Sequence, residues 1–233
     1  TRLQGDWSSD VCSSDLDTPH RYWQSAHAVA IQILTPGIPC IYYGTEQAFD
    51  GNEGYHDYSI EPQRFGEDRY VREDMFGGPF GAFQTTGCHF FNPEHPTYLR
   101  IAAIARLRKG KDRVGRTIRL GICYPRETSF CGYPFQFPGE GELFGWSRVL
   151  SYHEVLMALN THGLESRGAD VTIDENLNPP GTKLRVLYRA DWTDEQLKHP
   201  PTDEFITVEQ TSDGRAYVRL SLPPAGMIIL GGD

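Results

Sequence analysis

Three polar side chains that could bind a hydroxylated ligand follow a short apolar run, Ile38–Tyr43. Glu46 lies just past the end of this run, and Asp50 and Arg72 lie in the long polar segment after it. A guanidinium holds several N–H donors in one plane, which suits it to clamp hydroxyl groups. A carboxylate beyond the carboxyl end of a buried strand stands where barrels and doubly wound sheets handle ligands. The pattern predicts a ligand site here, with loop anchoring as the alternative for Glu46 and a solvated charge as the alternative for Asp50.

The same segment contains a group of metal-ligand types, Asp50, Glu53, His56 and Asp57. Calcium prefers clustered carboxylate and carbonyl oxygens. The spacing matches no fixed metal-binding loop, so we expect solvated loop side chains and no metal or other cofactor. His27 lies in an apolar stretch, and we expect it to pack within a helix rather than to bind a metal.

The elements that position these residues can be read from the flanking sequence. Residues 26–35 are nearly all apolar, which predicts a helix packed on a sheet, with Ser25 as its N-cap and Pro36-Gly37 as its end. Ile38–Tyr43 is a continuous apolar run, typical of a parallel strand buried on both faces, so Tyr42 and Tyr43 are expected in the core. Residues 48–86 form a polar loop of a length that is unusual unless it is functional.

A second helix and a set of strands follow. Pro96 suits the first turn of a helix that ends at Gly110, with cations in its last turn. Beyond Gly110 we expect no helix, and the turn Ser212-Asp213-Gly214 predicts a hairpin. Short strands separated by turns predict an antiparallel sandwich. The predicted strands are 117–124, 143–150, 154–161, 183–190, 204–211, 215–222 and 227–230, with a weaker one at 171–173.

Composition limits the possible partners. The 233 residues have a formal charge of −9, which argues against nucleic acid, because phosphate binding needs a basic surface. No stretch of about 20 apolar residues is present, so no membrane span is expected. Five cysteines lie without metal-ligand spacing. Cys123 and Cys131 could pair across a hairpin or remain free thiols.

The amino terminus differs from the rest. Asp6–Leu16 reads DWSSDVCSSDL, has no helical or strand periodicity, and resembles the translation of a common sequencing-library adapter. We therefore exclude residues 1–16 from the fold prediction and expect the protein proper to begin near Asp17. A genuine acidic linker is the alternative. The sequence shows no signal peptide and leaves the compartment unknown.

Several motifs resemble one family. Gly37-Ile-Pro-Cys-Ile-Tyr-Tyr-Gly-Thr-Glu-Gln47 is similar to the eighth barrel strand of the alpha-amylase family (family 13) of glycoside hydrolases. Arg72-Glu-Asp-Met75 resembles an element of the loop after that strand, and residues 95–108 resemble the eighth helix. Trp146-Ser-Arg-Val-Leu and Glu154–Asn160 resemble the family's C-terminal β-sandwich. The likeness covers essentially all of residues 17–233.

The resemblance implies a division of the chain. Residues 17–112 would be the last strand and flanking helices of a (β/α)8 TIM barrel, and residues 113–233 an all-β sandwich domain. Family members are retaining glycosidases in which an Asp attacks and a Glu protonates the leaving oxygen. Both come from strands that this sequence lacks. Asp17 could be a third carboxylate that stabilises the transition state, or an ordinary loop residue.

The resemblance implies an alpha-glucan or oligosaccharide substrate, bound in part by Arg72, Asp50 and Glu46. Some relatives bind calcium, but we predict none here. Without the nucleophile and the acid/base, we expect this polypeptide to be inactive. The alternative is a non-catalytic amylase-like scaffold or a carbohydrate-binding module. We also expect residues 17–110 to be unstable and the sandwich to fold alone, because the lone barrel strand would have lost its neighbours.

Overall fold

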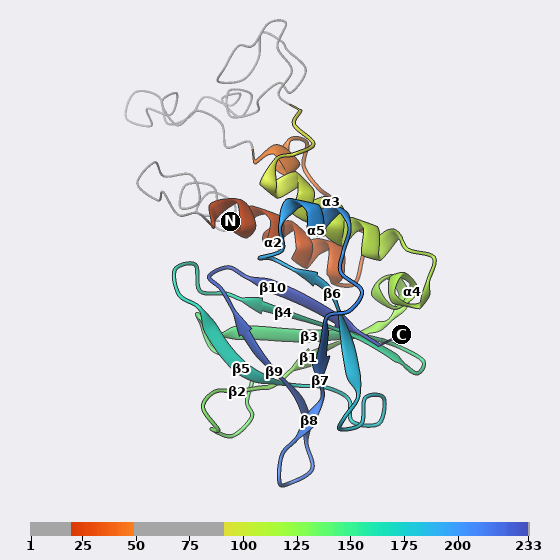
Figure 1. Cartoon of the computed structure of the whole chain (residues 1–233), viewed down its shortest axis with the longest axis vertical. Helices are drawn as coiled ribbons and strands as arrows, with labels where there is room; N and C mark the ends of the chain where they lie inside the picture. Colours follow the sequence, from red (N-terminus) through yellow and green to blue (C-terminus); the bar gives the residue numbers. More distant parts are fainter. Residues whose placement is uncertain (1–19, 49–90, 233) are drawn as a thin grey trace, which may run out of the picture.

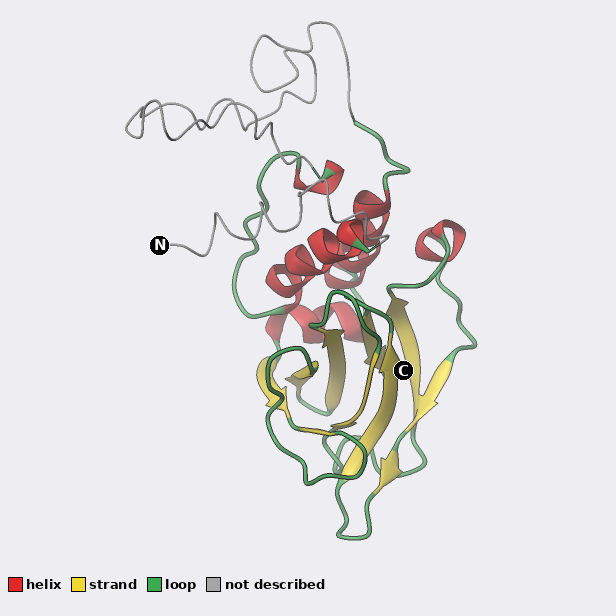
Figure 2. Ribbon diagram, turned by 90° about the vertical axis from the view of Figure 1, so that its left-hand side faces the viewer, coloured by secondary structure: helices red, strands yellow, loops and turns green. Residues whose placement is uncertain are grey.

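A computed structural model describes residues 20–48 and 91–232 of the chain. It contains three layers: a helical layer, a six-stranded antiparallel sheet and a four-stranded antiparallel sheet. Figures 1 and 2 show the helices over one face of the larger sheet and the smaller sheet on its other side. The predicted β-sandwich is therefore confirmed.

Helix α2 spans Arg21–Leu34 and is longer than predicted. Its N-cap is His20, so the prediction of Ser25 as the N-cap was wrong, since Ser25 lies within the helix. The buried residues recur at intervals of three and four and form one apolar face; they are Ala26, His27, Val29, Ala30, Ile33 and Leu34. The helix ends at Leu34, with Thr35 as its C-cap, directly before the predicted stop Pro36-Gly37.

The segment Ile38–Tyr43 does not form the predicted buried strand. No β-ladder includes it among the described residues, and its apolar side chains face solvent, with Ile38 97% exposed. Tyr42 and Tyr43, expected in the core, are 57% and 47% exposed. A buried parallel strand needs a hydrogen-bonded neighbour and a covering helix layer, and no described strand lies beside this segment.

Helix α3 spans Pro96–Lys109 and begins with proline at its first turn, as predicted. His95 is the N-cap, and its Nδ1 accepts a hydrogen bond of 3.2 Å from the Thr97 amide. Helices α2 and α3 lie side by side over the six-stranded sheet (Figure 1). Arg108 joins them, because its guanidinium donates to the carbonyls of Ile33 and Gly37 at 2.6 and 2.8 Å.

Two short helices correct the prediction that no helix follows Gly110. Helix α4 spans Arg113–Leu120 and α5 spans Asp194–Lys198. The predicted strand 117–124 therefore divides into the last turn of α4 and strand β1, Ile122–Arg126. Asp112 caps α4 by accepting a hydrogen bond of 2.8 Å from the Gly115 amide, a start signal that overrides the β-preference of Thr117 and Ile118.

The six-stranded sheet has the order β1-β3-β4-β10-β6-β7. Strand β10 lies between β4 and β6, although it is the last strand in sequence. The bounds after β1 are Leu143–Leu150 for β3, His153–Asn160 for β4, Lys183–Arg189 for β6, Phe205–Thr207 for β7 and Met227–Gly231 for β10. In this sheet β3, β4, β6 and β10 thus match four of the predicted strands to within one residue at each end.

The four-stranded sheet has the order β2-β5-β9-β8. Its strands are Thr128–Ser129 (β2), Arg167–Thr172 (β5), Glu209–Gln210 (β8) and Ala216–Leu222 (β9). The predicted strand 204–211 is divided between the two sheets, as β7 and β8. The predicted hairpin at Ser212-Asp213-Gly214 joins β8 to β9 and is confirmed.

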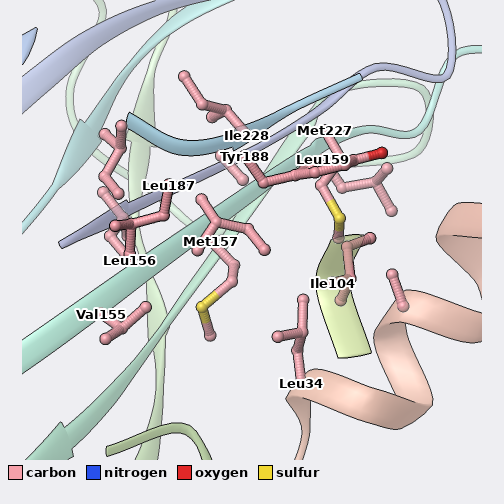
Figure 3. Close-up of a cluster of buried hydrophobic side chains, with 14 of the residues drawn as sticks. Leu34, Ile104, Val155, Leu156, Met157, Leu159, Leu187, Tyr188, Met227 and Ile228 are labelled. Atoms are coloured by element: carbon pink, nitrogen blue, oxygen red, sulfur yellow. The ribbon is translucent and has the colours of Figure 1, made fainter. Parts of the chain in front are cut away.

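One hydrophobic cluster includes side chains from all three layers. All eight residues of β4 are buried, because the strand is central in its sheet and covered on both faces. Leu34 of α2 and Ile104 of α3 belong to the same buried cluster as Met157 of β4 and Met227 of β10 (Figure 3). The apolar faces of α2 and α3 are therefore covered by the sandwich.

The structure shows the state of the described cysteines and the lengths of the described helices. Cys123 and Cys131 are free thiols, as is Cys40. The longest helices of residues 20–48 and 91–232 have 14 residues, and none of the helices described there could cross a bilayer.

Candidate functional site

Of the four candidate site residues, the structure places Glu46. It lies in a one-turn 3-10 helix, η1, Thr45–Gln47, and is half-buried. Asp17, Asp50 and Arg72 lie outside the described residues, as does the group Glu53, His56 and Asp57. Their proximity to Glu46 remains a prediction.

The turn around Glu46 is fixed by its backbone. Gly44 before η1 has φ 82° and Ala48 after it has φ 53°. A positive φ is accessible to glycine without steric cost, which explains Gly44 in the sequence. The Thr45 hydroxyl donates to the Tyr42 carbonyl at 2.7 Å and closes the turn. The polypeptide therefore reverses directly after the apolar run.

Gln47 anchors this turn to the start of α3. Its side chain is buried, its Oε1 accepts from the Asn92 amide at 2.8 Å, and its Nε2 donates to the Asn92 carbonyl at 3.3 Å. The backbone amide and carbonyl of Asn92, 45 residues away in sequence, thereby gain hydrogen-bond partners. The anchor is the amide at 47 rather than the neighbouring carboxylate, which leaves Glu46 available for a ligand. The sequence motif contains Gln47, but its spacing does not reveal the distant partner.

Aromatic rings lie near the anchored turn. Tyr42 and Tyr43 are exposed, and Phe91 packs edge-on against Tyr98 with ring centroids 5.3 Å apart. Exposed rings on one side of a chain can stack on the flat faces of sugars or cover an apolar partner. Together with Glu46 they form the candidate site.

A buried polar contact holds α2 on the sheet and so positions the candidate site. His27 Nδ1 donates to the Ala225 carbonyl at 2.6 Å, and its Nε2 accepts from the Tyr188 hydroxyl at 2.8 Å. The carbonyl can only accept, which assigns the proton to Nδ1. Burial lowers the pKa of His27 to about 3 and raises the pKa of Tyr188. Both groups are therefore neutral at pH 7, and His27 packs within its helix, as predicted.

Arg100 makes the corresponding contact from α3. Its Nε and Nη2 donate to the Ala190 carbonyl at 3.2 and 2.9 Å, and its Nη1 donates to the Pro96 carbonyl at 3.0 Å. The guanidinium lies over the Trp23 ring, 4.9 Å from its centroid. Burial lowers its pKa, but the group stays charged at neutral pH. Both long helices are thus tied to the strand end at Ala190 and the turn at Ala225.

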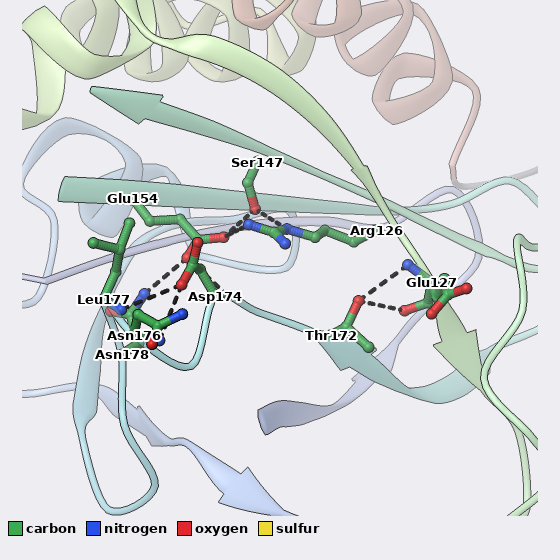
Figure 4. A network of polar contacts seen from close by, with 9 residues as sticks. All are labelled: Arg126, Glu127, Ser147, Glu154, Thr172, Asp174, Asn176, Leu177 and Asn178. Carbon is green, nitrogen blue, oxygen red and sulfur yellow. Dashed lines mark hydrogen bonds and ion pairs between the residues drawn. The ribbon is translucent and has the colours of Figure 1, made fainter. Parts of the chain in front are cut away.

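A second polar network lies inside the sandwich, around Glu154 of β4 (Figure 4). Its Oε1 accepts from Arg126 Nη2 and Ser147 Oγ, each at 2.5 Å. Its Oε2 accepts from the Asp174 amide at 3.1 Å and from Asn178 Nδ2 at 2.8 Å. The sequence analysis missed this network, because its members are single polar residues on separate strands and loops.

The chemistry of these networks is structural. The Glu154 carboxylate is buried and has four donors, so no lone pair faces a substrate. A retaining glycosidase needs two carboxyl groups about 5–5.5 Å apart across the bond to be cleaved, whereas the Glu154 side chain is fully buried within the sandwich. Within residues 20–48 and 91–232, no group of three or more His, Cys, Asp or Glu side chains could hold a metal ion.

Comparisons with known proteins show which solved structures share this fold. No family model matches this sequence. No curated protein matches it either. Solved structures do, with TM-scores of 0.54 for trehalulose synthase MutB, 0.53 for isomaltulose synthase from Klebsiella sp. LX3 and 0.52 for gamma-CGTase from alkalophilic Bacillus clarkii.

The matches include most of this chain but a minority of each enzyme. They cover 93%, 92% and 91% of this chain, at 13%, 11% and 12% identity, and 40%, 39% and 23% of the respective enzymes. The chain therefore spans less than half the length of the structures it matches. At these identities the likeness establishes the fold alone, which this chain shares with a segment of each of the three enzymes.

Proposed function

We propose that residues 17–233 are the C-terminal part of an enzyme of the alpha-amylase family that acts on alpha-glucans. Helix α2 would be the seventh barrel helix, α3 the eighth helix, and residues 113–233 the C-terminal sandwich. The segment Ile38–Tyr43, which is not a strand in this structure, would take the place of the eighth strand when the rest of the barrel is present. In this proposal the turn at Glu46 lies at the face of the barrel where substrate binds.

The observation that carries the proposal is the order of elements around the exposed apolar segment. Helices α2 and α3 pack on the sandwich, and the segment Ile38–Tyr43 between them presents Ile38, Ile41 and two tyrosines to solvent. Large apolar side chains are rarely left together on a surface unless another surface covers them. The remaining strands of a barrel would supply such a surface.

The substrate class follows from the resemblance and from the matched structures. Trehalulose synthase, isomaltulose synthase and gamma-CGTase are names of sugar-converting enzymes. The sequence motif that ends at Gln47 resembles the strand that lines the glucan cleft of this family. We propose that Glu46, Asp50 and Arg72 contribute to binding the sugar hydroxyls, and that Asp17 is the carboxylate that stabilises the transition state.

The polypeptide by itself is proposed to be inactive. Retaining hydrolysis needs a nucleophilic carboxylate and a carboxylic acid on opposite sides of the glycosidic bond. The family takes both from barrel strands that have no counterpart in this sequence. A reducing-sugar assay with purified protein on starch and maltooligosaccharides should give no release above the buffer blank; turnover that follows the protein concentration would contradict this part of the proposal.

A direct test of the proposed origin is the source DNA upstream of the codon for Asp17. We expect an open reading frame that encodes the earlier barrel strands with a nucleophile Asp and an acid/base Glu. An upstream frame in which both positions carry other residues would instead support the non-catalytic scaffold. Isothermal titration with maltoheptaose distinguishes a glucan-binding chain from an inert one.

A further inference from the structure

Three large aromatic side chains are exposed in the loop that joins β2 to β3. Phe130, Tyr133 and Phe137 are 55%, 69% and 63% exposed. Figure 1 shows this loop beside β2, at the end of the sandwich away from the helical layer. The barrel proposed above would meet the chain at the helical layer, so it does not account for the exposure of these rings.

The loop is a hydrogen-bonded hairpin. Thr128 and Gln136 exchange two backbone hydrogen bonds, at 2.8 and 3.0 Å. At the tip the Tyr133 amide donates to the Phe130 carbonyl at 3.0 Å, and the two residues between them have φ values of 51° and 79°. Positive φ at both central residues is typical of a type I′ turn, the tight turn that suits a hairpin. We term residues 128–137 the aromatic hairpin.

These contacts hold the backbone beneath the exposed rings. The Ser129 hydroxyl donates to the Tyr133 carbonyl at 2.5 Å. Phe130 and Tyr133 are the end residues of one turn, so their Cα atoms lie less than about 7 Å apart. Phe137 directly follows Gln136, whose backbone is paired in both directions. Because the backbone is already ordered, a ligand that contacts the rings would not have to order it, which favours binding.

A fourth ring connects the aromatic hairpin to the smaller sheet. Phe135 is half-buried, and its ring centroid lies 6.1 Å from that of Tyr217 in β9. The Arg215 guanidinium lies over Phe135, 5.4 Å from the centroid, and its Nη1 donates to Glu127 Oε2 at 2.6 Å. The Arg215 side chain is 46% exposed, so its other N–H groups can donate to a ligand beside the rings.

The kinds of exposed side chain indicate a sugar as the ligand. The large apolar side chains exposed between residues 128 and 142 are all aromatic. A pyranose has a flat face of C–H groups, which suits an aromatic ring, and a rim of hydroxyls, which suits charged donors and acceptors. A stable protein partner needs a larger continuous surface, about 800 Å² on each side, and no exposed aliphatic side chain extends the rings within this segment.

We propose that the aromatic hairpin is a surface site for an alpha-glucan chain, separate from the candidate site at Glu46. The three exposed rings stack on pyranose faces, and Arg215 and Glu127 bind hydroxyls at the edge of the same site. The choice of an alpha-glucan rests on the proposed function. The site itself rests on exposed rings that a paired backbone holds in place.

The test is isothermal titration of the purified chain with maltoheptaose, with glucose as the comparison. We expect saturable binding of maltoheptaose and much weaker binding of glucose, which can contact one ring at a time. Tyr133→Ala and Phe137→Ala should each weaken binding by about three- to tenfold, the effect of losing one ring contact. Tyr152→Ala removes another exposed tyrosine ring, from the β3–β4 hairpin, and should leave binding unchanged. Thermal melting checks that each variant is folded.

The absence of saturable binding, or equal losses in Tyr133→Ala and Tyr152→Ala, would overturn the proposal. Self-association of the chain that Tyr133→Ala abolishes, measured by sedimentation velocity without glucan, would show that the rings cover a second copy instead. Loss of binding in Glu46→Gln but not in Tyr133→Ala would place the glucan at the candidate site and overturn the surface site alone. An upstream reading frame without barrel strands, together with intact binding at the aromatic hairpin, would overturn the proposed origin and support the surface site.

Discussion

His27 and Tyr188 lie 161 residues apart in sequence, yet the Tyr188 hydroxyl donates to His27 Nε2 at 2.8 Å in the buried layer between α2 and the six-stranded sheet. The two rings meet edge-on, with centroids 5.9 Å apart. This contact fixes where α2 lies on the sandwich, and so fixes the direction in which the segment after α2 leaves it. The position of the candidate site thus depends on a contact far from it in sequence.

Removing this hydroxyl should destabilise the protein. In Tyr188→Phe the acceptor Nε2 of His27 remains buried without a donor, which costs about 1–3 kcal/mol of unfolding free energy. Urea unfolding followed by circular dichroism measures the change. Tyr152→Phe, which removes the hydroxyl of an exposed tyrosine, is the matched control and should change little. Equal stability of Tyr188→Phe and the parent protein would show that the hydrogen bond contributes nothing.

Acid should destabilise the protein through His27. Burial lowers the pKa of His27 to about 3 in the folded state, against an ordinary value of 6.5. Between these pH values the unfolded chain binds a proton that the folded protein does not, so stability falls as pH falls. This group contributes a slope of up to about 1.4 kcal/mol per pH unit in that window and none above it.

The measurement is the unfolding free energy of the parent protein and of His27→Gln from pH 3 to 8. We expect the difference between the two to change below pH 6.5 and to be constant above it. Two curves that stay parallel throughout would exclude His27 as the source of the pH dependence. Tyr188 and Arg100, which face the imidazole, are present in both proteins.

Breaking the Glu154 network should cost more than breaking a surface ion pair. In Glu154→Leu the Arg126 guanidinium, Ser147 Oγ and Asn178 Nδ2 lose a buried acceptor, and loss of one partner of a buried pair typically costs about 3–5 kcal/mol. Arg219→Gln removes one partner of the exposed pair with Asp170 and should cost less than about 1 kcal/mol.

Chemical unfolding of both variants checks the difference. The double variant Arg126→Met with Glu154→Leu should lose less stability than the sum of the two single variants, because no unpaired buried charge is left. Additive losses would indicate that the ion pair is not the reason for the cost.

The helical layer and the sandwich are expected to unfold together. Leu34 and Ile104 are fully buried in the cluster that the helices share with the sheets (Figure 3), so Leu34→Ala and Ile104→Ala should each cost about 2–5 kcal/mol. Ile38→Ala, at a residue 97% exposed, should have little effect. Tryptophan fluorescence reports on both layers, since Trp23 lies in α2 and Trp146 in β3. Two separate transitions would show that the sandwich folds alone.

The sequence predicted most of the sandwich because its strands have local signals. Leu143–Leu150 is bounded by turns, and Ser212-Asp213-Gly214 marks a hairpin, so both were found without any distant information. Helix α4 was missed because Thr117 and Ile118 prefer strands, while the deciding signal was the cap at Asp112. The burial of Ile38–Tyr43 was predicted wrongly, because burial depends on neighbours that a single segment does not reveal.

The candidate site, like the fold, could be predicted from the sequence only in part. The residue types at Glu46 and Gln47 are visible in the sequence, and a turn after an apolar run can be predicted from Gly44. The hydrogen bonds between Gln47 and Asn92 cannot be predicted from the sequence, because 45 residues separate the two. The buried interactions of Glu154 and His27 are likewise set by tertiary packing, so they become visible only when the sheets are assembled.

The position of β10 has a consequence for aggregation. Among the described strands, β1, β3 and β4 form one half of the larger sheet and β6 and β7 the other, and β10 joins them. If β10 detaches, the backbone groups of β4 and β6 that face it lose their hydrogen-bond partners, and two strand edges become open to another chain. Local release of this one strand is therefore the opening from which we expect intermolecular strand pairing to begin.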